Sequence, residues 1–161
     1  MSIPLLDKWH KGIRIEQIAH LRAAAHFGRL HRRLGVPVTV FSIIVGTSVF
    51  GSLNETGLEW LLIIAGVLSV LAAVLSGLQT FLSYESLAME HQAAGTEYGK
   101  LRHFVEEMRV VIKDEAELEK KLPEVREAWD RLLAESPALP QRFVDMAMEM
   151  VKRKGDRGGV G

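Results

Sequence analysis

The sequence predicts an all-α membrane protein built around a two-transmembrane helical hairpin. Two uncharged apolar runs carry this prediction, one over about residues 34–53 and the other over residues 60–82. At about 1.5 Å per residue, each run is long enough as a helix to cross a hydrocarbon layer of ~30 Å. The few residues between the runs allow only a tight turn, so both flanking segments are expected on the same side of the membrane.

The segment before the first span is expected to form an amphipathic helix from Leu5 to Leu34, because its apolar residues recur near one stripe. Gly35 and Pro37 are expected to end this helix, with Pro37 in the first turn of the span, where its missing N–H costs least. Basic residues outnumber acidic ones before the first span, whereas the turn carries Glu55 and Glu59 and no base. The positive-inside rule therefore predicts a multi-pass protein with both termini in the cytoplasm.

The second span is expected to continue into the cytosol as one long helix, because no breaker residue follows it. Residues along this extension recur at alternating steps of three and four, which is typical of a coiled-coil seam. Residues 1–113 are accordingly predicted to form a two-span core, followed by cytosolic helices over residues 114–151 and a disordered tail over residues 152–161. The seam consists of Tyr84, Leu87, His91, Ala94, Tyr98, Leu101, Val105, Met108 and Ile112.

Local signals divide the C-terminal part. Asp114 and Glu117 have the spacing of a capping box that opens a helix, and Pro123 is expected to start or kink a further one. Residues 136–140 contain two prolines and predict a clear break. A short amphipathic helix carrying Phe143 is expected after this break.

Small residues at a spacing of four predict close helix packing in the membrane. Lipid tails give apolar helices no hydrophobic reason to associate, so close backbone approach along small faces drives their packing. Because the spans carry more than one such face, the sequence favours a homo-oligomer; the alternative is that all these residues serve the intrachain hairpin. The predicted packing residues are Ser42 and Gly46 on the first span, and Ala65, Ser69, Ala73 and Gly77 on the second.

The polar side chains within the spans are uncharged, which argues against a transporter, a proton relay or a voltage sensor. As single residues they serve as interhelical hydrogen-bonding groups, but in a ring of subunits the same face could line a weakly selective path, with Glu55 and Glu59 at its outer mouth. The candidate lining residues are Thr39, Ser76, Gln79 and Thr80.

Other functional classes are disfavoured by composition and spacing. The chain has 20 basic and 20 acidic residues, which argues against a dedicated nucleic-acid binder, and it has no cysteine. Glu16 and His20 share a helical face, but the histidine spacing fits no known metal cage, and His91 is interpreted as a packed, hydrogen-bonded seam residue. No nucleophile has a base beside it, so we expect no catalytic residues, no metal and no cofactor.

Two groups of residues, one in each half of the chain, occur in the order and at the spacing found in one known protein family. The first half contributes Ala23, Ala24 and Phe27, followed by residues 34–38 and 44–53. The second half contributes residues 75–82, followed by His91, Ala94, Tyr98, Leu101, Arg102 and Glu106. Over about residues 19–106 the chain resembles the SLATT family, the two-transmembrane effector domains associated with SMODS nucleotidyltransferases and SLOG sensors.

The resemblance implies a function that the residue patterns alone do not. It implies an effector of a bacterial conflict or antiviral system, located in the inner membrane, which oligomerises and permeabilises that membrane. The signal would come from a partner that produces or senses a nucleotide second messenger. A second hypothesis remains, in which the chain is a non-catalytic anchor or scaffold and the seam from Tyr84 to Ile112 is its docking surface.

Overall fold

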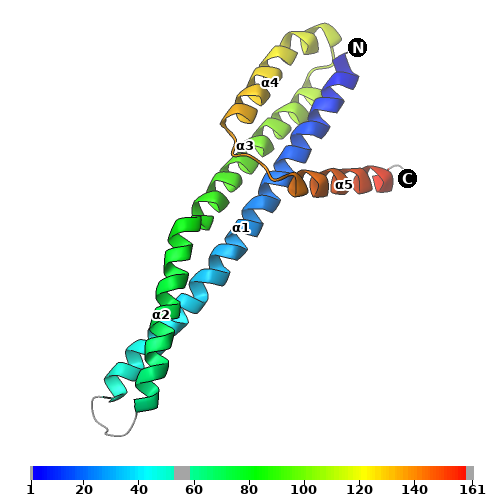
Figure 1. Ribbon diagram of the computed structural model, residues 1–161. Coiled ribbons are helices and arrows are strands. Elements are labelled where there is room, and N and C mark those ends of the chain that lie inside the picture. Colours follow the sequence, from blue (N-terminus) through cyan, green and yellow to red (C-terminus); the bar gives the residue numbers. More distant parts are fainter. Residues whose placement is uncertain (1, 53–58, 159–161) are drawn as a thin grey trace. The chain divides into compact units, whose positions relative to one another are not determined.

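The computed structural model describes residues 2–52 and 59–158, and within these ranges the chain is all-helical and contains no β-strand. Residues 53–58, which hold Glu55 and most of the expected turn, lie outside the described residues. The prediction of an all-α protein is confirmed. The helices of the described part are α1 (Ser2–Ser52), α2 (Glu59–Leu82), α3 (Tyr84–Val111), α4 (Glu115–Glu135) and α5 (Gln141–Gly158) (Figure 1).

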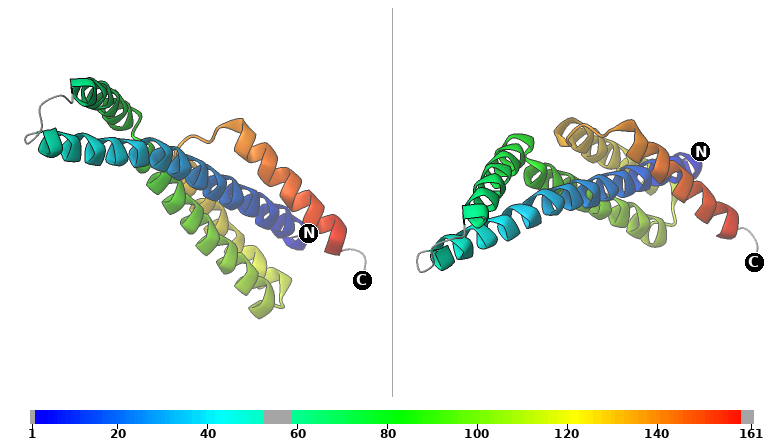
Figure 2. Two further views of the ribbon diagram at one scale, coloured as in Figure 1. Left: turned by 90° about the horizontal axis from the view of Figure 1, so that it is seen from below. Right: turned by 60° about the horizontal axis from the view of Figure 1, so that its bottom comes forward.

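The helices form two compact units. Unit 1 comprises the residues up to Ala25 together with those from Ala88 onward, and unit 2 comprises His26–Leu87. Unit 1 therefore joins the N-terminal part of α1 to α3, α4 and α5, and unit 2 joins the remainder of α1 to α2. Within unit 1, α3 runs beside α1, and α5 crosses α1 (Figures 1 and 2).

The helix α1 continues through Gly35 and Pro37, so the expectation that these residues end the first helix is wrong. Proline leaves the carbonyl four residues before it, that of Arg33, without a backbone donor. In the same turn the hydroxyl of Thr39 donates a hydrogen bond to the carbonyl of Gly35 at 3.1 Å.

The expected unbroken extension of the second span is also corrected, because Ser83 separates α2 from α3. Ser83 has a φ of 45°, a left-handed conformation that costs a non-glycine residue about 1–2 kcal/mol. The backbone N–H of Ser83 donates to the carbonyl of Gln79 at 3.2 Å, and its hydroxyl donates to the carbonyl of Thr80 at 3.1 Å. These hydrogen bonds hold the junction in its unusual conformation.

The C-terminal helices follow the predicted signals in part. Asp114 is the N-cap of α4, and its carboxylate accepts a hydrogen bond from the backbone N–H of Ala116 at 3.2 Å. Pro123 lies inside α4 and does not start a further helix, which corrects that expectation. The break between Glu135 and Gln141 is confirmed, and α5 extends to Gly158, into the segment for which a disordered tail was predicted.

Unit 1 has a continuous hydrophobic core between α1, α3 and α4. Trp9 of α1 meets Trp129 of α4 edge to face, with ring centroids 6.4 Å apart. Gly12 lies so close to this ring that an added Cβ would stand 2.7 Å from a Trp129 ring carbon. The buried members of the core are Leu6, Ile13, Tyr98, Leu101, Val105, Met108, Leu118 and Val125.

Unit 2 contains little buried surface. Phe27 and Tyr84 stack with centroids 6.0 Å apart, Gln79 lies against Gly35, and Ala65 is buried. In contrast, large apolar side chains of α2 are exposed on several sides of the helix. They include Leu62, Ile63, Ile64, Val67, Val70, Leu71, Val74, Leu78 and Phe81.

One stretch among the described residues is long and apolar enough to cross a membrane by length and composition. It lies in the helical run that begins at Leu62 in α2, and its most apolar 18-residue window has a mean hydropathy of 2.2, with 6% of the window buried. The predicted first span, residues 34–53, ends beyond the side chains that the structure describes.

The close approach of α1 to α3 generates a prediction about Gly95. A Cβ at this position would lie 2.8 Å from Cδ2 and 2.9 Å from Cγ of Leu21. We expect Gly95→Leu to lower the free energy of unfolding of unit 1 by about 1–3 kcal/mol, because overpacking forces the helices apart. Thermal and denaturant unfolding of the full chain, followed by circular dichroism, measures this change. Ala93→Leu is the matched control, since Ala93 is exposed on the same helix; equal losses in both variants would contradict the prediction.

Candidate functional site

The polar interface between α1 and α3 in unit 1 is the candidate functional site. On α1, the residues facing this interface recur at steps of four and three, and the set mixes apolar and polar side chains. Because a helix has 3.6 residues per turn, this spacing keeps all of them on one face. They are Leu6, His10, Ile13, Gln17, His20 and Ala24.

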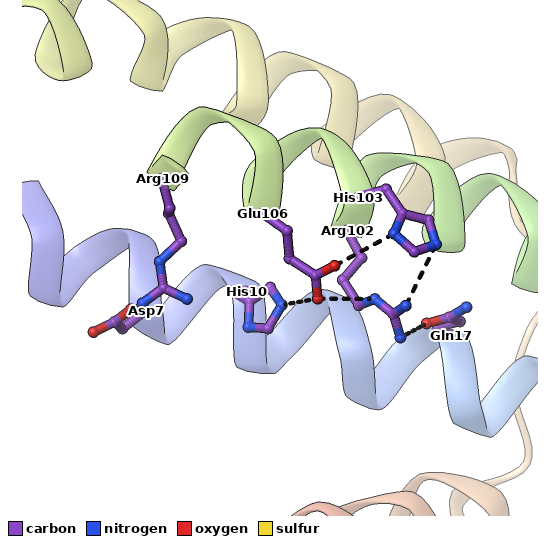
Figure 3. A network of polar contacts seen from close by, with 7 residues as sticks. All are labelled: Asp7, His10, Gln17, Arg102, His103, Glu106 and Arg109. Atoms are coloured by element: carbon purple, nitrogen blue, oxygen red, sulfur yellow. Dashed lines mark hydrogen bonds and ion pairs between the residues drawn. The ribbon is translucent and has the colours of Figure 1, made fainter. Parts of the chain in front are cut away.

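A network of charged and polar side chains crosses the interface toward the end of α3 (Figure 3). Nε2 of His10 lies 2.9 Å from Oε1 of Glu106, and Nε of Arg102 lies 3.3 Å from the same oxygen. Arg102 also donates to Oε1 of Gln17 at 2.9 Å. Farther along, Arg109 and Asp7 form a second ion pair between the helices.

The carboxylate of Glu106 is the centre of this network. The hydrogen bond from His10 holds the pKa of Glu106 below its usual range, and the positive charge of Arg102 acts in the same direction. Nδ1 of His103 lies 3.3 Å from its other oxygen. Because Glu106 is partly exposed, solvent screens these pairs, and they specify how the two helices align more than they stabilise the fold.

A buried aromatic cluster crosses the same interface nearer the centre of the helices. Nδ1 of His20 on α1 lies 3.0 Å from Nδ1 of His91 on α3, and each residue is only 1% exposed. The His20 ring stacks on the ring of Tyr98, with centroids 5.4 Å apart and an interplanar angle of 19°. The two histidines and the tyrosine thus form one contact between the helices.

The surroundings of the cluster disfavour charge. Burial, with a smaller contribution from the neighbouring His91, lowers the pKa of His20 to about 4. Burial also lowers the pKa of His91, against the opposing effect of Glu90. Burial raises the pKa of Glu16, one turn before His20, and the pKa of Tyr98.

The hydroxyl of Tyr98 is buried without a completed hydrogen bond to any residue that the structure describes. The hydroxyl of Ser136 approaches it and lowers the tyrosine pKa, but it does not reach good bonding geometry. A buried hydroxyl without a partner carries a desolvation cost.

The residues of the predicted seam from His91 to Met108 are buried on α3, whereas Tyr84 and Ile112 are half-buried. His91 is packed and hydrogen-bonded, as its position in the seam predicted, and its partner is His20. Tyr98, Leu101 and Val105 belong to the core of unit 1. The chain's own helices cover this face from His91 to Met108.

The predicted packing and pore-lining residues lie in unit 2 and are not brought into one site. Ala65 is buried, Gly46 and Gln79 are half-buried, and the other members of both groups are exposed. Their roles remain predictions. The exposed members are Ser42, Ser69, Ala73, Gly77, Thr39, Ser76 and Thr80.

Sequence reasoning did not identify the partner of His91. It placed His20 on the same face as Glu16, and the structure brings that face against α3. The regular spacing of Leu6, Ile13 and His20 could have indicated this arrangement. Among the described residues, no group of three or more His, Cys, Asp or Glu side chains could hold a metal ion.

Comparisons of the chain with protein-family models, with curated protein sequences and with solved structures found no match.

The unpaired hydroxyl generates a prediction about Tyr98. We expect Tyr98→Phe to raise the free energy of unfolding by roughly 1 kcal/mol, because it removes a buried polar group and keeps the stacked ring. Chemical denaturation of the full chain measures the change, and Tyr84→Phe is the control, since Tyr84 is only half-buried. A loss of stability in Tyr98→Phe would show that the Ser136 hydroxyl completes a hydrogen bond in solution.

Proposed function

We propose that the chain is a membrane effector that oligomerises and permeabilises the bacterial inner membrane on a signal from a nucleotide-producing or nucleotide-sensing partner. The observation that carries the membrane part is the exposed apolar surface of α2. Ile63, Val70 and Phe81 are 68%, 65% and 84% exposed, and the stretch from Leu62 carries no charge. A helix that is apolar on all sides requires lipid or other helices around it.

In the proposed arrangement, the uncharged run in α1 also crosses the membrane and lies antiparallel to the span in α2. Val36 and Ile43 in this run are 59% and 60% exposed, which fits the same surroundings. The exposed hydroxyls of Thr39 and Thr80 donate to carbonyls of their own helices at 3.1 Å each. Such internal hydrogen bonds permit hydroxyls within a hydrocarbon layer. The basic flank before residue 34 then places both termini in the cytoplasm.

The proposed contact between subunits is the small-residue face of α2. Ser69, Ala73 and Gly77 are exposed, and a Cβ at Gly77 would meet nothing within 4 Å. The intrachain contact includes Ala65, at one end of this face, and Gln79, whereas the helix turns Ala73 and Gly77 progressively away from Ala65. The small-residue face is therefore available for close approach by another subunit.

The resemblance to SLATT domains supports two parts of the proposal, namely the effector role and activation by a nucleotide-producing or nucleotide-sensing partner. Unit 1 would receive the signal, and no catalytic step by this chain is required. The same test distinguishes the scaffold hypothesis, because an anchor would insert without changing membrane permeability.

The test is to induce the chain in cells, alone and with its genomic neighbours, and to record membrane potential and dye entry. We expect activated cells to depolarise and admit dye. Insertion is verified in the same cells with an impermeant thiol reagent, which should label a single cysteine at Thr56 and spare one at Ala116. Intact potential in cells that contain the inserted protein would contradict the effector role and favour the scaffold; the opposite labelling pattern would contradict the topology.

The subunit contact generates a separate prediction. We expect Gly77→Leu to preserve insertion but to reduce the oligomer, because the added side chain keeps the neighbouring helix away at a cost of about 1–3 kcal/mol per contact. Cross-linking and size measurement in mild detergent report the oligomer. Leu71→Phe is the control, since Leu71 is exposed on a side of α2 that lies well away from both Gly77 and Ala65. An unchanged oligomer in Gly77→Leu would show that this face meets lipid.

A further inference from the structure

The contact between His20 and His91 has no role in the proposed membrane activity and is the most unusual feature of unit 1. Two ionisable rings from helices distant in sequence are each 1% exposed, and their Nδ1 atoms lie 3.0 Å apart. The contact lies within unit 1, where Gly95 and Gly99 allow α3 to approach α1 closely. A change in this contact therefore alters the packing of α1 against α3.

The hydrogen bond requires a particular distribution of protons. One Nδ1 must carry a proton and donate it, while the other Nδ1 must be bare and accept it. A first added proton converts the donor ring into an imidazolium, and the bond can persist, although a charge is now buried. A second added proton removes the acceptor, so that two N–H groups would face each other across 3.0 Å.

The residues around the pair do not supply a strong counter-charge. On α1, Glu16 lies one turn from His20, and its burial favours the neutral carboxylic acid. On α3, Glu90 favours a charged His91, but it is exposed. The aromatic ring of Tyr98 covers one face of His20.

The other elements of unit 1 contribute few charges. On α4, Glu135 lines a surface hollow of about 430 Å³ together with Glu90, Ala94 and Ser136. The helix α5 crosses α1 with buried apolar side chains, Phe143, Ala147 and Val151, while its Met150 accepts a hydrogen bond from the exposed Arg22. Protonation of the pair is therefore compensated poorly by its surroundings.

The direction of the pH effect follows from these surroundings. The pKa of each ring is lower in the closed contact than the ordinary value of 6.5, and that of His20 falls to about 4. Separation of the rings restores their ordinary affinity for protons. Opening therefore takes up protons as the pH falls from about 6.5 toward 4, and the closed contact loses stability throughout this range.

We infer that His20 and His91 form an acid-sensitive latch, which holds α1 against α3 while both rings are neutral and releases them when both are protonated. The latch does not depend on the proposed membrane function, because it concerns packing within unit 1. It has a route to the remainder of the chain, since α1 continues into unit 2 and only Ser83 separates α3 from α2.

The test uses the full chain in lipid nanodiscs and exploits its lack of cysteine. A cysteine introduced at Ala94, which is buried on α3 one turn after His91, reports opening through its reaction with dithiodipyridine, a reagent that remains reactive in acid. A cysteine at Ala93, exposed on the same helix, reports the intrinsic reactivity at each pH. The ratio of the two labelling rates follows the open population.

We expect this ratio to rise more than a hundredfold between pH ~6.5 and pH ~4.5, because each ring that gains a proton on opening changes the population by up to about tenfold per pH unit, and both rings contribute. His91→Asn places an amide near the position of Nδ1 but cannot be protonated, and it should reduce the rise to that of any remaining single ring. His103→Asn is the matched control, since the side chain of His103 is 69% exposed, and it should retain the full rise.

Two results would overturn the latch: a ratio that does not change with pH in the parent chain, or an equal rise in His91→Asn. Should His91→Asn fail to fold, nuclear magnetic resonance of the ring nitrogens in the parent chain decides. Both rings must gain protons over the pH range in which Ala94 becomes reactive. Labelling while the rings remain neutral would contradict the inference. None of these measurements involves permeability, so failure of the latch and failure of the effector role are distinguishable.

Discussion

The close contact between α1 and α3 is the constraint on which the rest of unit 1 depends. Gly95 and Gly99 bring the backbones together, so that an added Cβ at either position would clash with Leu21 or Gln17. At this separation, any polar group in the interface loses water and needs a partner on the facing helix. The pairs His10–Glu106 and His20–His91 meet that need, and α4 completes the core through Trp129.

The polar pairs contribute alignment more than stability. A one-turn slip of α1 along α3 would separate the buried rings of His20 and His91, and it would also separate the exposed ion pair of Asp7 and Arg109. Apolar side chains in the same positions would tolerate such a slip, since they pack without directional bonds. Alignment matters here because α1 and α3 both connect unit 1 to the segments of unit 2. The same pairing makes the interface responsive to protons, because histidines are the only side chains that ordinarily titrate near neutral pH.

Unit 2, in contrast to unit 1, has few close contacts between its helices. Its side chains are apolar and exposed, and the few contacts between α1 and α2, such as that of Gln79 with Gly35, cover little of this surface. Stability of these helices must come from surroundings that the isolated chain lacks, and lipid and neighbouring subunits are the surroundings that we propose. Unit 1 is a helical bundle with polar pairs between its helices, and unit 2 consists of apolar helices. This difference suits an effector that would receive a signal through unit 1 and act on the membrane through unit 2.

The sequence by itself determined the helical class, the uncharged run in α2, the buried face of α3, the N-cap at Asp114 and the break before α5. Each of these depends on local spacing or on a single residue's preference, which a sequence displays directly. Only the tertiary structure showed which helix covers the buried face of α3. The facing side of α1 carries the polar residues His10, Gln17 and His20, so its apolar periodicity is not evident from the sequence. The structure also showed that α1 continues through Pro37, that α4 continues through Pro123, and that Ser83 separates α2 from α3. The helices continue through both prolines although each proline removes one backbone hydrogen bond. Periodicity identifies a buried face, but it does not identify the helix that buries that face.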